Sequence, residues 1–124
     1  MKIEGLSIGD WVMYKNREWQ VCSLYQFTGE VGLWRNDSQI CENVADLTPI
    51  PLTPEILEKN GCLHTAENRI LCDWFDGRIT VRKYNNREWY ELFVGSNQMK
   101  FKLMFVHQLQ RAMNLAGIEK EIIL

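Results

Sequence analysis

The chain has 124 residues, of which 14 are Lys or Arg and 16 are Asp or Glu, so its formal net charge is −2. Hydrophobic residues make up 46% and charged residues 24%, which is typical of a chain that folds around a core and excludes a disordered one. No apolar run approaches the ~20 residues needed to cross a bilayer, and no apolar segment follows the start, so we expect a cytoplasmic protein without a signal peptide or membrane contact.

The first half of the chain consists of short β-rich runs separated by turn residues. Extended segments are expected at 10–14, 18–27, 31–34, 39–42 and 48–52, with a single helical turn at 44–47 before the last of them. Five short strands in this order predict an SH3-like small β-barrel over residues 1–52. In strand order and in its entry Gly9-Asp10-Trp11-Val12, this part resembles the Tudor and KOW type of barrel.

Two local features of this half are specific enough to test. Lys15-Asn16 suits a tight two-residue loop, because Asn tolerates the left-handed conformation that such a loop requires. The run that begins at Glu18 alternates, and this pattern predicts one shared face for Trp19, Val21, Ser23, Tyr25 and Phe27.

The second half begins with a short helix. Thr53 is a good N-cap, Pro54 fits the first helical position and Gly61 is a helix stop. Strands are then expected at 70–75, 79–84, 88–94 and 99–103, with turns at Asp76-Gly77 and Asn85-Asn86. The second turn places Lys83 opposite Glu88.

An apolar stripe predicts one further helix over residues 104–116. The predicted fold class is therefore α+β and mainly β. Residues 53–124 form a helix and an antiparallel β-meander packed by the C-terminal helix, either as a second part or as one continuous domain with residues 1–52.

Two hexapeptides, Tyr14–Trp19 and Tyr84–Trp89, match at five of six positions, 70 residues apart. A duplication would explain the match, and so would two hairpin turns under the same conformational demands. We favour the two turns, because the neighbouring residues do not extend the match.

The four cysteines do not have the spacing of a metal site. No C-x-x-C pair occurs, and the nearest approach to a zinc pattern is the irregular Cys62-Leu63-His64 followed by Cys72. A reducing cytoplasm also argues against disulfides. We therefore expect no metal and no cofactor, and we expect Cys22, Cys41 and Cys72 to be small buried hydrophobic side chains.

The aromatic residues raise the alternative of a stacking platform for single-stranded nucleic acid. Such platforms combine aromatic rings with a basic groove, whereas here most arginines stand beside acidic residues and the local charge nearly cancels. Core packing is the expected role of the tryptophans in strand patterns, which are Trp11, Trp19, Trp74 and Trp89.

A small set of polar and aromatic residues is left as the predicted interaction surface. Trp34, beside Arg35, is the tryptophan expected to be exposed. His107 and Arg111 fall on the polar stripe of the C-terminal helix. We predict that Trp34, Arg35, His107 and Arg111 contact a partner.

No catalytic motif is present in the sequence. The two histidines, His64 and His107, have no nucleophile elbow, glycine-rich phosphate loop or H-E-x-x-H pattern near them. We therefore predict that the protein is not an enzyme. An enzyme would need a concave polar pocket near one of these histidines.

Two segments resemble a group of small uncharacterised proteins that are abundant in gut Bacteroidetes genomes, often near prophages or other mobile elements. They are residues 50–61, IPLTPEILEKNG, which contain a P-L-T-x-x-x-L-x-x-x-G turn-helix, and residues 105–110, FVHQLQ, which contain a V-H-Q-L-Q helix. The resemblance implies a cytoplasmic, β-rich fold and a mobile-element setting. It brings no catalytic residue.

These observations predict a non-catalytic interaction protein whose partner is another protein. Nucleic-acid binding through the barrel is the alternative, and a small enzyme is a more remote one. The sequence does not predict the oligomeric state.

Overall fold

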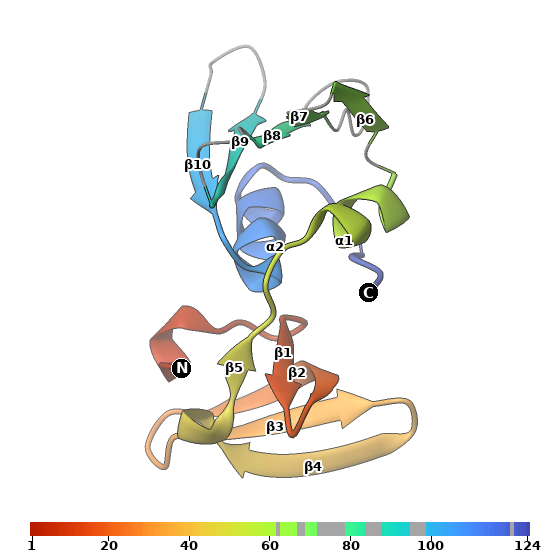
Figure 1. Ribbon diagram of the computed structural model, residues 1–124. Coiled ribbons are helices and arrows are strands. Elements are labelled where there is room, and N and C mark those ends of the chain that lie inside the picture. Colours follow the sequence, from red (N-terminus) through yellow and green to blue (C-terminus); the bar gives the residue numbers. More distant parts are fainter. Residues whose placement is uncertain (62, 67–68, 72–78, 84–87, 95–98, 120) are drawn as a thin grey trace. The chain divides into compact units, whose positions relative to one another are not determined.

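The computed structural model describes residues 1–61, 63–66, 69–71, 79–83, 88–94, 99–119 and 121–124 (Figure 1). The chain divides into two compact units, and each contains residues from both halves of the sequence. The first is Met1–Ile50 with Phe105–His107, and the second is Pro51–Met104 with Gln108–Leu124. The fold is mainly antiparallel β with one longer helix near the C-terminus, which confirms the predicted α+β, mainly β class.

The first unit contains an antiparallel five-stranded sheet in the order β4-β3-β2-β1-β5 (Figure 1). Its strands are β1 (Trp11–Tyr14), β2 (Arg17–Tyr25), β3 (Glu30–Arg35), β4 (Ser38–Asn43) and β5 (Thr48–Pro49). Two 3-10 turns accompany them, η1 (Ile3–Gly5) and η2 (Val44–Asp46). The predicted strands and the turn before the last strand are therefore present. The sheet is open, however, so a closed SH3-like barrel is not confirmed.

Tight loops join the first four strands where local chemistry predicts them. Tyr14 pairs with Arg17, and the two residues between them have φ angles of 47° at Lys15 and 64° at Asn16. Both angles lie in the left-handed region that two-residue hairpin loops require. The predicted Lys15-Asn16 loop is thus confirmed. Asn36, in the loop between β3 and β4, also has a φ in the left-handed region, at 47°.

The core of the first unit lies on one face of the sheet. Its buried members come from the strands and from the segments that flank them: Leu6, Val12, Val21, Val31, Leu33 and Leu47. Trp19, Leu24 and Ile40 are partly buried and pack against this cluster. The burial of these side chains supplies the main apolar stabilisation of the unit.

Strand β2 contains a β-bulge that changes which side chains reach this core. The pairing of β2 with β3 shifts between Val21 and Ser23, so Cys22 is the extra residue. Beyond the bulge Leu24 packs on the core, whereas Tyr25 is 52% exposed. The predicted shared face of Val21, Ser23 and Tyr25 is therefore wrong, because the alternation restarts after the extra residue.

The second unit contains two small antiparallel sheets and two helices. A three-stranded sheet has the order β10-β9-β8, and a two-stranded sheet pairs β6 with β7. The elements are α1 (Pro54–Lys59), β6 (Leu63–Ala66), β7 (Arg69–Leu71), β8 (Ile79–Lys83), β9 (Tyr90–Val94), β10 (Met99–Leu103) and α2 (Val106–Leu115), whose first two residues belong to the first unit. Neither helix, nor any other in the described residues, is long and apolar enough to span a bilayer.

Both predicted helices are present. In α1 the Thr53 hydroxyl accepts a hydrogen bond from the Ile56 amide at 3.3 Å, as expected of an N-cap, and Pro54 is the first helical residue. The predicted apolar stripe of α2 is buried at Val106, Leu109, Ala112 and Met113. The helix is shorter than predicted by two residues at its start and one at its end.

The strand register in the three-stranded sheet differs from the prediction. Lys83 pairs with Tyr90, not with Glu88, so six residues (84–89) separate the pair. This register places Val81 opposite Leu92, and both side chains are fully buried. The burial of this pair outweighs the short turn that the Asn85-Asn86 sequence favours. The other predicted turn, Asp76-Gly77, lies outside the described residues, and the strands that flank it, β7 and β8, belong to separate sheets.

The last residues of the chain are held to the end of α1 by one buried amide. Asn60, only 4% exposed, donates from Nδ2 to the carbonyls of Ile56 and Ile123, both at 2.7 Å. Its Oδ1 accepts from the Ile123 amide at 2.8 Å. The Lys59 ammonium also donates to the Leu124 carbonyl. Asn60 thus pairs with both the amide and the carbonyl of Ile123. The side chain of the preceding residue, Ile122, is buried.

Replacing Asn60 should release this segment and destabilise the protein. We expect Asn60→Ala to lower the free energy of unfolding by about 1–3 kcal/mol, because three partly buried hydrogen bonds are lost. Urea denaturation measures the loss, and hydrogen exchange at the Ile123 amide locates it. Asn114→Ala, at an exposed position of α2, is the control and should change stability by less than about 0.5 kcal/mol. Equal stabilities of the two variants would contradict the role of Asn60.

Candidate functional site

The side of the five-stranded sheet opposite the core, here called the outer face, carries the candidate site. Paired residues of β2, β3 and β4 alternate between the two sides of the sheet. The rows through Leu33 and Val31 belong to the core. The row between them brings Ser23, Gly32 and Cys41 together. The row beyond Val31 brings Tyr25, Glu30 and Asn43 together on the same side of the sheet. The outer face is therefore made by β2 after its bulge, together with β3 and the edge strand β4.

A glycine at the centre of the outer face makes room for its neighbours. Gly32 is buried, and Ser23 Oγ lies where a side chain at position 32 would begin. Cys22 Sγ is 3.2 Å from the same point. A hollow of about 280 Å³ lies here, lined by Cys22, Ser23, Tyr25, Gly32 and residues 39–41. The bulge and the glycine together create this depression in an otherwise regular sheet.

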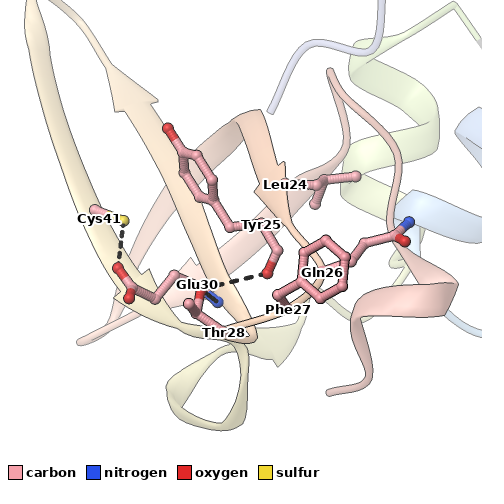
Figure 2. A pocket seen from close by; sticks show the side chains of 7 residues that line it. All are labelled: Leu24, Tyr25, Gln26, Phe27, Thr28, Glu30 and Cys41. Carbon is pink, nitrogen blue, oxygen red and sulfur yellow. Dashed lines mark hydrogen bonds between the residues drawn. The ribbon is translucent and has the colours of Figure 1, made fainter.

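A larger hollow of about 690 Å³ adjoins it at the end of the strands. It is lined by residues 24–28, Glu30 and Cys41. Figure 2 shows how these side chains come from the end of β2, the following loop, the start of β3 and the middle of β4. Tyr25 and Cys41 line both hollows, which are together called the concave region here. Its volume lies in the range of sites that bind small molecules or single side chains of a partner.

The loop between β2 and β3 is folded by its own hydrogen bonds. The Gly29 amide donates to the Tyr25 carbonyl at 2.9 Å, and Gly29 has a φ of 73°, which a glycine adopts without strain. The Glu30 amide donates to the Thr28 hydroxyl at 3.3 Å (Figure 2). Phe27 lies within this folded loop and is fully exposed, at 107% of its reference area. The loop therefore holds a large apolar ring in water.

Cys41 and Glu30 form the polar side of the larger hollow. Cys41 Sγ donates to Glu30 Oε2 at 3.2 Å (Figure 2). This hydrogen bond, together with the nearby charges of Glu30 and Glu42, raises the pKa of the Cys41 thiol above its ordinary value. A thiol held in its protonated form is a weak nucleophile. The geometry makes Cys41 a hydrogen-bond donor rather than a reactive group.

The prediction that the cysteines are buried is wrong for Cys41, which is exposed, and Cys22 is half-buried. Cys41 lies on an edge strand in the row of Gly32, and a glycine cannot cover it. Cys62, Cys72 and the side chain of His64 lie outside the described residues. Within the described part of the chain, no three His, Cys, Asp or Glu side chains are grouped so that they could hold a metal ion.

The charge of the two hollows is acidic. Among the residues that the structure describes, Glu30 is the single charged residue that lines them, and no Lys or Arg does so. Glu42 lies close enough to Cys41 to raise the pKa of its thiol and adds a second negative charge nearby. The concave region thus combines exposed aromatic rings with negative charge, a combination that suits cationic or apolar groups and repels phosphate.

The structure places the predicted interaction residues in both units. Trp34 is 41% exposed and belongs to the outer face, in the row of Gln20 and Gln39, whereas Arg35 is half-buried. His107 is half-buried, with its ring stacked on Phe105 at 5.9 Å between centroids. Arg111 is half-buried and belongs to the second unit. That these four residues contact a partner stays a prediction.

The other tryptophans differ in their surroundings. Trp19 packs against the core cluster, as predicted. Trp11 is half-buried, as is Trp89, which carries the Lys102 ammonium 4.3 Å from its ring centroid. Trp74 lies outside the described residues.

Sequence reasoning missed Tyr25, Phe27, Glu30 and Cys41 as site residues. The sequence pattern places Tyr25 and Phe27 on the face of Trp19 and Val21, and Cys41 in the interior. One available signal was the aromatic residue immediately before Thr28-Gly29, because a side chain beside a turn is seldom enclosed on all sides.

Compared with protein-family models, with curated proteins and with solved structures, the chain matches none of them.

The Cys41–Glu30 hydrogen bond makes a prediction about thiol reactivity. At pH 8, Cys41 should react slowly with iodoacetamide for an exposed cysteine, because its raised pKa leaves little thiolate. Glu30→Gln should lower the pKa and accelerate the reaction several-fold, whereas Glu18→Gln, which lines neither hollow, should not. Mass spectrometry of the Cys41 peptide over pH 6–10 gives the rates. A Glu30→Gln profile identical to that of the unaltered protein would contradict this account.

The close approach at Gly32 makes a prediction about stability. We expect Gly32→Ala to destabilise the protein by about 1–3 kcal/mol, because the new methyl group would collide with Ser23 Oγ. Adding Ser23→Ala should recover part of the loss, since the nearest atom is then removed. Gly5→Ala is the control, because no atom lies within 4 Å of the added carbon. Equal denaturation midpoints for Gly32→Ala and Gly5→Ala would show that position 32 tolerates a side chain.

Proposed function

We propose that the protein is a non-catalytic binding module that contacts another protein through the outer face of its N-terminal sheet. The observation that carries the proposal is the Phe27 ring, fully exposed on a loop that hydrogen bonds hold in place. Leaving this ring in water forgoes about 1.5–3 kcal/mol of burial, which a partner would recover. Tyr25 and Trp34 extend the aromatic surface across the same sheet. Aromatic anchors beside a pocket are characteristic of the centres of protein interfaces.

The chemistry of the concave region favours binding over catalysis. Its thiol is kept protonated by Glu30, and the lining residues in the described ranges include no histidine. A thiol whose pKa is raised has little thiolate at neutral pH and is a weak nucleophile. We accordingly assign no catalytic residue.

The charge of the region favours a protein over a nucleic acid as the partner. Single-stranded nucleic acid needs cations that follow its phosphates, whereas the lining residues that the structure describes offer one carboxylate and no cation. Nucleic-acid binding is therefore an outcome of the test rather than a second proposal.

The finer fold and the cellular setting are part of the same proposal. An SH3-like classification of the first unit is supported by the strand order β4-β3-β2-β1-β5 and by the η2 turn before β5. A cytoplasmic, mobile-element setting rests on the resemblance of residues 50–61 and 105–110 to the Bacteroidetes group.

Site-specific photo-crosslinking tests the proposal. A benzophenone amino acid is placed at position 27, and in a matched control at Leu115, which is also exposed but belongs to the second unit. We expect a protein partner to be crosslinked from position 27 and not from position 115, with or without nuclease treatment of the lysate.

The identified partner is then purified and its affinity measured. Phe27→Ala should weaken binding by about 10–100-fold, as the loss of one buried aromatic ring predicts, and Leu115→Ala by less than twofold. Crosslinks that are the same from both positions, or that disappear on nuclease treatment, would refute the proposal.

A further inference from the structure

The larger hollow offers a carboxylate with spare hydrogen-bonding capacity. Glu30 Oε2 accepts from the Cys41 thiol, which fixes the orientation of the carboxylate. Its second oxygen, Oε1, has no hydrogen-bond partner among the described residues. A carboxylate that is oriented by one neighbour and open on its other side is a strong acceptor for an ammonium or guanidinium group.

The same hollow presents two aromatic rings without ring partners. Tyr25 is 52% exposed and Phe27 fully exposed, and neither makes a ring contact within the described part of the chain. Figure 2 shows the Glu30 side chain directed toward Cys41 with the Tyr25 ring beside this pair, whereas the Phe27 ring lies in the loop and points away from the Glu30 carboxylate. Aromatic faces attract cations, and Leu24 adds an apolar wall against which the stem of a long side chain can lie.

In the described part of the chain, no cation lines this hollow. None of the described lining residues is Lys or Arg, the thiol beside Glu30 is neutral, and the charge of Glu42 is close enough to raise the pKa of Cys41. The hollow therefore carries net negative charge. An acidic or phosphorylated segment would be repelled here, whereas a basic one would be attracted.

On the basis of the proposed function, we propose that this hollow receives the Lys or Arg side chain of a partner protein, with the cationic group at the Glu30 carboxylate and against the Tyr25 ring, and with Phe27 at the rim of the hollow. The proposal specifies the partner chemistry as a basic segment. Arginine would use both the carboxylate and a ring face through its planar group, and lysine would act as a point charge.

Single-residue probes test the proposal before any partner has been identified. The probes are N-acetyl-lysine amide and N-acetyl-arginine amide, with N-acetyl-norleucine amide as the uncharged match and N-acetyl-glutamate amide as the opposite charge. Each is titrated into the ¹⁵N-labelled protein, and backbone amide shifts are followed. We expect saturable shifts at residues 24–30 and 41 for the two cationic probes, with a Kd on the order of millimolar, and at least tenfold weaker binding of the other two.

Variants show which side chains of the hollow bind the cationic probes. Glu30→Gln should weaken binding of the cationic probes about tenfold, and Tyr25→Ala should weaken it several-fold. Glu18→Gln, an exposed carboxylate outside the hollow, should leave it within twofold. Raising the salt concentration from 50 to 500 mM should weaken binding of the cationic probes and leave any norleucine binding unchanged.

The outcomes separate this inference from the proposed function. Norleucine binding as tight as lysine, or no shift with any probe at 50 mM, would overturn the cationic site, while crosslinking from position 27 would still decide whether a protein is bound there. Shifts of the same residues with an oligothymidine probe would overturn both. Unchanged urea midpoints of the variants exclude unfolding as the cause of any loss.

Discussion

The β-bulge at Cys22 opposite Gly32 is the constraint on which the rest of the first unit depends. A regular strand would keep Tyr25 on the same side as Val21 and would turn Leu24 away from the core. With one extra residue, Leu24 packs on the core and Tyr25 faces outward, so the strand serves the interior before the bulge and the outer face beyond it. This arrangement requires a glycine at position 32, because Ser23 occupies the space of its missing side chain. The same irregularity thus completes the core and opens the concave region.

The outer face carries an exposed aromatic residue on a loop and, in the same hollow, a thiol whose raised pKa lowers its reactivity. The loop at residues 26–29 is closed by its own hydrogen bonds, which order the backbone at Phe27. The Cys41 thiol donates a hydrogen bond to Glu30, which keeps the thiol neutral and the carboxylate oriented. An ordered loop backbone and an oriented acceptor lower the entropy that binding a ligand would cost.

Features set by neighbouring residues were predictable from the sequence, and features set by distant ones were not. The Lys15-Asn16 loop and the Thr53 cap follow from local backbone chemistry, and the structure confirms both. The bulge depends on Gly32, ten positions away, and the exposure of Cys41 depends on its edge strand lying beside that glycine. The register of β8 with β9 was missed for a similar reason, since burial of Val81 against Leu92 decides it rather than the turn. The candidate site therefore depends on strand pairings between distant segments, which the sequence of any one segment does not predict.

Stability and binding should be separable in this chain because different atoms carry them. Tyr25, Phe27 and Glu30 are exposed and make few contacts with the core, so their replacement should cost little folding free energy. Gly32 and Asn60 are buried, and each has a structural role. Gly32 leaves space for the Ser23 side chain, and Asn60 forms hydrogen bonds with the backbone of Ile123. The aromatic ring of Phe27 is fully exposed, so it adds no hydrophobic burial to the stability of the fold. Folding therefore does not explain its presence on the loop, and the proposed contact with another protein would.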